Sequence, residues 1–236
     1  MPELPEVQTI VDDLNRKILG RKVVACWYDW HKFKDVEKAV GHTIKKVARM
    51  GKNILFYLQD SHILLVHQKM TGHLLVGKWA IDGKKLTPLE PATFKEKVND
   101  YIHFILTLDD GRMVGLSDLR KFGKVAFGAV REMEKLPELK GLGPDALSPR
   151  LTAGEFVRRI QAKKKTIYQA LMEQTVIAGI GNIYVSECLF AAKIHPFRQA
   201  NQLKEGELKR LFAAVRKILR LALRLRGTST SDYRDT

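Results

Sequence analysis

The stretch AGIGNIYVSECLFAAKIHP, residues 178–196, joins a glycine-rich turn directly to an apolar helical segment. Glycine admits positive φ angles and leaves backbone N–H groups uncovered, and here these groups precede the positive N-terminal end of the next helix. Such a turn can bind a phosphate. A glycine-rich turn is more often a helix C-cap, so the motif alone leaves both an anion site and a structural turn open.

The residues around this turn predict a helical region. Two capping-box pairs indicate further helix starts ahead of it: Thr152 with Glu155, and Thr166 with Gln169. A final helix is predicted from about residue 204 to 226, because its apolar residues recur at helical spacing and Gly227 follows. Residues 151–236 are therefore predicted to form a helical domain.

The first half of the chain is predicted to be mainly β. A helix over residues 5–19, with apolar residues at helical spacing, precedes short β-branched and aromatic runs separated by glycine and polar turns. The run YIHFILTLDDGRMVGLSD, residues 101–118, predicts a hairpin through its DDG turn. Proline and glycine break the pattern over the linker 131–150. We expect an α+β fold whose N-terminal domain, residues 1–130, is a two-sheet β-sandwich with a flanking helix.

The charge of the chain points to a polyanionic partner. The chain has 41 Lys+Arg against 26 Asp+Glu, a net charge of +15, and residues 150–236 alone carry a net +10. Nucleic acid is the simplest partner for such a surface. A basic surface that serves solubility or ribosomal association is the alternative.

The membrane and secretion signals of the sequence indicate a cytoplasmic protein. No apolar run reaches the roughly 20 residues that span a bilayer, and the start lacks a signal-peptide pattern, so no membrane partner is expected. Cys26 and Cys188 lie far apart and lack metal-ligand spacing, so both are expected to be buried hydrophobic residues.

The N-terminal sequence PELPEV, residues 2–7, contains a candidate nucleophile. Initiator methionine is normally removed before a small residue, which leaves Pro2 with a free secondary amine. An α-amine titrates near 7.7–8.0, against about 10.4 for lysine, so a larger fraction is neutral and able to attack an electrophile at pH 7. A disordered terminus without a role is the alternative.

Five motifs together resemble the bacterial formamidopyrimidine-DNA glycosylase family. They occur in the family's order: PELPEV at 2–7, KMTG at 69–72, DLRKFG at 118–123, LGPDAL at 142–147, and the stretch at 178–196. Leu4 distinguishes the chain from the endonuclease VIII relatives, which typically have glycine at this position. The resemblance implies a β-sandwich packed against a helix-two-turn-helix domain, residues 151–236, with DNA bound in the cleft between them.

The implied activity is that of a bifunctional DNA glycosylase and AP lyase in base excision repair, which removes oxidised purines such as 8-oxoguanine and formamidopyrimidines. Pro2 would form the Schiff base with the sugar, and Glu3 would protonate the opening deoxyribose ring. Lys52 would hold a phosphate near the lesion, with a solvated turn lysine as its alternative. Glu6 would support the site, although a helix-dipole partner is nearly as good an interpretation.

The resemblance also implies a set of DNA contacts. Extruding a base leaves a gap in the duplex. Met70 and Phe122 would wedge into that gap, while Arg120 would form hydrogen bonds with the orphaned base. Met70 is expected on a strand, so the alternative is that it is an ordinary core residue. The implied phosphate contacts are His67, Lys121, Asn182 and Lys164.

Three positions depart from the family pattern. Leu119 replaces the usual proline, and Lys121 replaces a second arginine, which keeps the charge and loses the bidentate geometry. Tyr168 stands where many relatives carry a lysine, so one phosphate contact is expected to be missing.

Relatives usually continue into a four-cysteine zinc hairpin that grips DNA, and the present sequence has no remaining cysteine pair. We therefore expect a monomer without metal or other cofactor, in the bacterial cytoplasm near the nucleoid, that binds damaged duplex DNA weakly and excises lesions poorly. A truncated fragment of the enzyme, or a relative that binds lesions without cutting, is the main alternative. A basic RNA- or ribosome-associated protein is a third.

Overall fold

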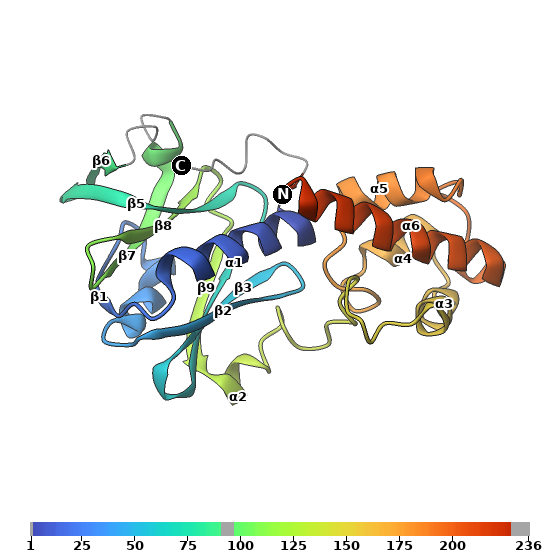
Figure 1. The fold of residues 1–236 in the computed structure, drawn as a ribbon, viewed down its shortest axis with the longest axis horizontal. Coiled ribbons are helices and arrows are strands. Elements are labelled where there is room, and N and C mark those ends of the chain that lie inside the picture. The colour runs from blue at the N-terminus through green and yellow to red at the C-terminus, as the bar shows by residue number, and fades with distance from the viewer. Residues whose placement is uncertain (1, 91–96, 228–236) are drawn as a thin grey trace.

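The computed structural model describes residues 2–90 and 97–227. It has an α+β fold, with two antiparallel sheets on one side and a group of helices on the other (Figure 1). Helix α1 (Leu4–Ile18) begins at the helices and runs along the sheets. The predicted fold class is confirmed.

The strands form one five-stranded sheet in the order β1-β7-β8-β5-β6 and one four-stranded sheet in the order β2-β3-β4-β9. The first sheet consists of β1 (Val23–Tyr28), β5 (Gly72–Asp82), β6 (Lys85–Glu90), β7 (Ile102–Leu108) and β8 (Met113–Asp118). The second consists of β2 (Ile44–Met50), β3 (Asn53–Leu58), β4 (His62–His67) and β9 (Lys124–Ala129). The predicted hairpin is the antiparallel pair β7–β8.

Helix α1 closes the core between the sheets. Its apolar residues fall at helical spacing and are at most 5% exposed: Val7, Ile10, Val11, Leu14 and Ile18. They pack with buried residues of both sheets, such as Phe56 and Phe104. Pro5 lies in the first turn, where a missing N–H is tolerated. A periodic apolar face thus fixes one helix against both sheets.

The remaining helices enclose a second core. They are α3 (Ala153–Gln161), α4 (Ile167–Met172), α5 (Asn182–Ala191) and α6 (Glu205–Arg224). The short helix α2 (Val130–Met133) packs instead on the four-stranded sheet, where Met133 contacts a cluster with Leu55 and Leu65. Thr166 and Gln169 form the predicted capping box. At α3, Thr152 Oγ1 accepts from the Glu155 N–H at 3.1 Å as expected, whereas the Glu155 carboxylate accepts a hydrogen bond from Arg159.

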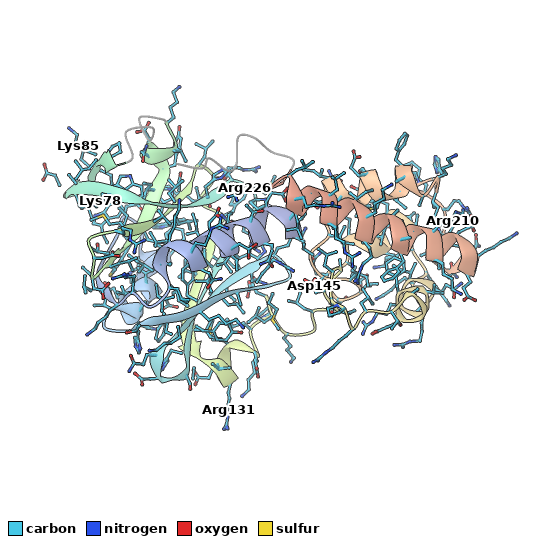
Figure 2. All side chains as sticks on the ribbon, in the orientation of Figure 1. Lys78, Lys85, Arg131, Asp145, Arg210 and Arg226 are labelled. Atoms are coloured by element: carbon cyan, nitrogen blue, oxygen red, sulfur yellow. The ribbon has the colours of Figure 1, made fainter. Side chains whose placement is uncertain are left out.

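Contacts from α1 join the two cores. Leu4 is buried in the core of the helices, and its N–H donates to the Gly179 carbonyl at 3.0 Å. Arg226, just beyond α6, pairs with Asp13 of α1 at 2.7 Å. Figure 2 labels Arg226 and also Asp145, the ion-pair partner of Arg49 from β2, where the sheets meet the helices. One helix therefore belongs to both halves of the molecule.

Several local expectations need correction. Met70 lies in the turn between β4 and β5 rather than on a strand. Cys188 is buried as expected, but Cys26 is only half-buried. The 3₁₀ segment η1 (His31–Ala39) and the strand β9 were not predicted. Within the described ranges, no helix has the length and apolarity needed to cross a bilayer.

We expect Leu211→Ala in α6 to destabilise the protein by about 2–5 kcal/mol, because Leu211 is 0% exposed and its truncation leaves a cavity. Leu221→Ala in the same helix is the control, since Leu221 is 47% exposed, and should cost below about 1 kcal/mol. Urea denaturation of both variants measures the difference. Equal losses would show that the buried face of α6 is misassigned.

Candidate active site and nucleic-acid interface

The Glu3 carboxylate caps the N-terminus of α5. It accepts hydrogen bonds from the backbone N–H groups of Gly181 at 2.6 Å and Ile183 at 2.9 Å, with Tyr184 N–H at 3.5 Å. The N-cap residue Gly181 offers no side chain of its own, so an acid from α1 supplies the cap. The glycine turn is therefore an anion site, as one interpretation of the sequence held, but its occupant is Glu3 rather than a phosphate.

The glycines of the turn are required by close approach. A Cβ on Gly181 would lie 2.4 Å from both the Glu3 carboxyl carbon and Lys52 Nζ. Gly179 has φ +101°, and a Cβ there would lie 2.7 Å from Leu4 Cδ1. A side chain at Gly181 would displace the Glu3 carboxylate and the Lys52 ammonium, and one at Gly179 would displace Leu4.

Lys52 is buried beside this carboxylate. It lies in the turn before β3 and is 7% exposed, so it is not a solvated turn lysine. Burial lowers the pKa of Lys52, and the charges of Glu3 and Glu6 act in the opposite direction. Burial likewise raises the pKa of Glu3, opposed by Lys52 and the α5 backbone. A buried acid with a raised pKa is suited to donating a proton.

Glu6 positions the chain's first residues. One of its oxygens accepts from the Glu3 N–H at 3.0 Å, and the other accepts from the Tyr184 hydroxyl at 2.6 Å. It therefore ties α1 to α5 alongside the Glu3 cap. Pro2, also buried, precedes Glu3 directly, so the candidate nucleophile is adjacent in the chain to the candidate acid.

The predicted wedge residues gather on an exposed surface. Met70 and Phe122 are each 48% exposed, and neither is a core residue. The Arg120 guanidinium lies 4.7 Å from the Phe122 ring centroid and 3.4 Å from Met70 Sδ. One arginine thus holds together two apolar side chains from separate turns.

Asp118, which sequence reasoning missed, organises the loop that carries this wedge. It is fully buried and accepts from the Gly123 N–H at 2.7 Å, the Arg120 N–H at 3.3 Å and the Thr71 hydroxyl. Its carbonyl oxygen lies 3.0 Å from Nε2 of His103. Its place inside the DLRKFG motif was the available signal.

His67 lies at the end of β4 as a neutral imidazole. Burial, together with the charges of Lys69 and Lys52, lowers its pKa to about 4. Its Nδ1 accepts from the Lys69 N–H at 3.0 Å, which leaves the proton on Nε2. His67 can therefore donate to an anion without carrying charge.

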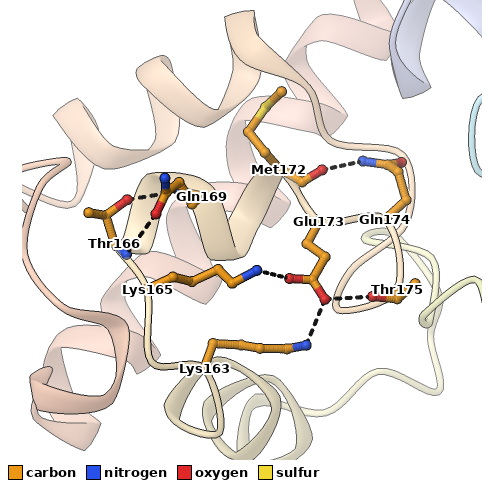
Figure 3. Close-up of polar contacts among 8 residues, drawn as sticks. All are labelled: Lys163, Lys165, Thr166, Gln169, Met172, Glu173, Gln174 and Thr175. Atoms are coloured by element: carbon orange, nitrogen blue, oxygen red, sulfur yellow. Dashed lines mark hydrogen bonds and ion pairs between the residues drawn. The ribbon is translucent and has the colours of Figure 1, made fainter.

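The three consecutive lysines at 163–165 differ in their contacts, and Figure 3 shows the two that bind Glu173. Lys163 and Lys165 bind the Glu173 carboxylate at 2.6 Å and 2.5 Å. Hydrogen bonds from these lysines and from Thr175 lower the pKa of Glu173 to about 2. Lys164 is exposed while its two neighbours bind Glu173, and its role as a phosphate contact stays a prediction.

Asn182, the first residue of α5, is exposed and its side-chain oxygen accepts from the Tyr168 hydroxyl. Tyr168 thus contacts a predicted phosphate ligand at the position where many relatives carry a lysine. Lys121 is exposed and has φ +55°. The roles of all these residues in DNA binding remain predictions.

Metal binding was predicted to be absent. Among residues 2–90 and 97–227, no group of three or more His, Cys, Asp or Glu side chains is arranged to hold a metal ion. Cys26 and Cys188 are free thiols. Independence from zinc stays a prediction for the chain as a whole.

Two family profiles match the chain. The formamidopyrimidine-DNA glycosylase N-terminal domain matches residues 1–125, and the formamidopyrimidine-DNA glycosylase H2TH domain matches residues 142–234. Among curated relatives, the formamidopyrimidine-DNA glycosylases of Herpetosiphon aurantiacus and Desulfitobacterium hafniense are 35% and 34% identical. Each alignment covers 100% of this chain and 83% of the relative.

Solved structures agree in fold. The chain resembles a variant of the Lactococcus lactis enzyme bound to DNA containing Fapy-dG, with a TM-score of 0.84 and 30% identity over 98% of this chain and 82% of that one. The L. lactis enzyme bound to abasic-site DNA matches with the same TM-score and 29% identity, over the same shares of the two chains.

The buried acid on a helix N-terminus, the exposed wedge and these matches define a DNA repair glycosylase. The chain belongs to the formamidopyrimidine-DNA glycosylase family.

We expect Gly181→Ala to lower base excision by about 100-fold, because a Cβ there would displace Glu3 and Lys52 and small displacements at a reacting centre are costly. Gly206→Ala in α6 is the matched control, since a Cβ there meets nothing within 4 Å and alanine favours a helix. Excision rates and melting temperatures of both variants check this. Unimpaired excision by the Gly181 variant would contradict the assigned site.

We expect the Glu173→Gln variant to lose less folding stability than wild type as the pH falls below 4.5. Because the pKa of Glu173 is lowered from 4.5 to about 2, its stabilisation is present above pH 4.5 and is lost as pH falls toward 2. The variant lacks that contribution at neutral pH, and its stability should fall less over this window. Urea denaturation at pH 7, 4.5 and 3 measures it, with exposed Glu187→Gln as the control. Parallel plots of stability against pH for Glu173→Gln and wild type would refute the stabilising contact of Lys163 and Lys165 with Glu173.

Proposed function

We propose that this chain excises oxidised purines, such as 8-oxoguanine and formamidopyrimidines, from duplex DNA and then cleaves the strand through a Schiff base on Pro2. The observation that carries the proposal is a pair of buried ionisable side chains, Glu3 and Lys52, which pack against Gly181. Glu3 directly follows Pro2 in the chain. The L. lactis relative has been crystallised with Fapy-dG DNA and with abasic-site DNA, which supports this class of substrate.

The first half of the reaction replaces the bond between C1′ and the damaged base with a bond between C1′ and Pro2. After removal of Met1, the Pro2 nitrogen attacks C1′ of the damaged nucleotide and the C1′–base bond breaks, with the bonding electrons leaving on the base. The proton that the Pro2 nitrogen loses on bonding to C1′ passes to the departing base, which leaves neutral. Glu3 donates its proton to the ring oxygen O4′ as the C1′–O4′ bond opens, which leaves an iminium between Pro2 and C1′. The raised pKa of Glu3 supports its role as the acid.

The second half cleaves the strand. The iminium acidifies the C2′ hydrogens, and loss of one of them to a base, for which the Glu3 carboxylate is available, expels the 3′ phosphate by elimination. Water then hydrolyses the iminium and returns the free amine. Lys52 remains close to Glu3 throughout and offsets the negative charge that the carboxylate acquires.

The proposed DNA interface follows from exposure and charge. Met70 and Phe122 would fill the gap left by the extruded base, and Arg120 would bond its former partner. Phosphates of the duplex would be held by the predicted contacts His67, Lys121, Lys164 and Asn182. The net charge of +15 supports association with DNA and hence with the nucleoid.

We expect borohydride to trap a covalent adduct between Pro2 and a duplex containing 8-oxoguanine, because it reduces the iminium to a stable amine. Pro2→Gly should reduce trapping at least about tenfold, since the secondary amine is lost. Peptide mapping of the adduct identifies the attached residue. Attachment to an internal lysine would contradict the assignment, and tight binding without any adduct would favour a lesion-binding relative.

We expect Glu3→Gln to suppress base excision more than cleavage of a preformed abasic site, because ring opening of an intact nucleoside depends more on the acid. Single-turnover rates on the two substrates measure the ratio. Asp12→Asn, an exposed acid on the same helix, is the control and should change neither rate. Equal loss on both substrates would make Glu3 a structural residue only.

A further inference from the structure

A second cluster of aromatic and basic residues adjoins the wedge loop, residues 119–123. Lys32 of η1 donates from Nζ to the carbonyl of Lys121 at 2.7 Å, so η1 is tied to the backbone of that loop. Lys32 and Lys121 both lie over the ring of Trp30, at 5.1 Å and 5.7 Å from its centroid. We call Trp30, Lys32 and Lys121 the Trp30 cluster.

The Trp30 cluster is open to solvent. Trp30 is 41% exposed, and both lysines are exposed. Lys121 lies between Arg120 and Phe122 in the chain, and Arg120 contacts both Phe122 and Met70, so the cluster adjoins the surface formed by these two apolar residues. An aromatic ring flanked by cations beside an existing nucleic-acid surface has the chemistry of a nucleotide contact, because the ring packs against base or sugar while the cations bind phosphate.

The charges around the cluster favour an incoming anion. Burial lowers the pKa of Lys32, and the positive charges of Lys124 and Lys69 lower it further, while Asp118 opposes them. Asp29 faces the cluster, but it lies 3.9 Å from Lys121 Nζ and is engaged with His103 Nδ1 at 2.9 Å. The cations Lys32, Lys121, Lys124 and Lys69 outnumber the two acids near them, Asp29 and Asp118, so a phosphate that binds there gains Coulomb energy.

We propose that the Trp30 cluster is a DNA contact beside the wedge, in which Lys32 and Lys121 bind a backbone phosphate and the Trp30 ring packs against the adjoining deoxyribose. The inference rests on the proposed function and adds Trp30 and Lys32, which lie outside the family motifs quoted above. It also gives a role to Lys121, whose lysine in place of arginine loses bidentate geometry and gains a neighbouring indole.

The test uses the full chain and a duplex that contains an uncleavable abasic analogue, with fluorescence anisotropy over a salt series. Trp30→Ala should weaken binding about tenfold, in the range that aromatic contacts to nucleotides provide. Lys32→Met should weaken it at all sequences and lower the salt slope by about one. Lys34→Met, an exposed lysine on the same 3₁₀ segment, is the control and should stay within about twofold of wild type.

Trp30 also packs edge-to-face on buried Phe33, at 6.0 Å between ring centroids, so its truncation can affect folding. Trp30→Phe keeps an aromatic ring, should retain the melting temperature and should restore most of the binding. If the Trp30→Ala variant does not fold, Lys32→Met tests the proposal. Binding and a salt slope equal to those of wild type in the Lys32→Met variant would overturn it.

Failure of the Trp30 cluster is distinguishable from failure of the proposed function. Wild-type protein that forms no borohydride adduct with 8-oxoguanine DNA would refute the function. An active wild type whose Trp30→Ala and Lys32→Met variants bind like Lys34→Met would refute only the cluster.

Discussion

The hydrogen bonds from the N-terminus of α5 to the Glu3 carboxylate are the constraint on which the structure depends. They bring together residues 178 positions apart in the chain and join the two cores at one carboxyl group. The absence of a side chain at Gly181, the approach of Leu4 to Gly179 and the contact of Glu6 with Tyr184 all follow from this junction. The acid is thereby held by backbone, which cannot rotate away as a side-chain partner can.

The same arrangement balances opposing electrostatic effects. Burial favours the neutral form of Glu3, whereas the α5 backbone and Lys52 favour its carboxylate. Burial favours the neutral form of Lys52 as well, and the acids restrain it. Each group therefore limits the pKa shift of the other. A group with a single fixed protonation state could not act first as an acid and later as a base.

Local patterns in the sequence predicted most of the fold. The apolar spacing of α1, the DDG hairpin and the Thr166–Gln169 capping box depend on neighbouring residues, so they are legible without tertiary structure. The segment η1 was missed, although Phe33, Val36 and Ala39 repeat at the spacing of a 3₁₀ helix.

The site was less predictable, because its decisive contacts are long-range. The glycine turn indicated an anion site, but nothing near it in sequence names Glu3 as the occupant. The lysine run at 163–165 gives no local reason why two lysines bind Glu173 and the middle one stays exposed. Trp30 and Asp118 gain their roles only through partners on other elements.

The dependence of Glu3 on α5 also sets an order in time during synthesis. The residues that carry the proposed amine and its acid are the first to leave the ribosome, yet the cap of Glu3 is made of residues 181–184, in the second half of the chain. A nascent or incomplete chain therefore has the amine without the buried acid beside it. The proposed chemistry therefore depends on α5 having been made and folded, so the helical half of the molecule completes a site whose first residues are synthesised long before it.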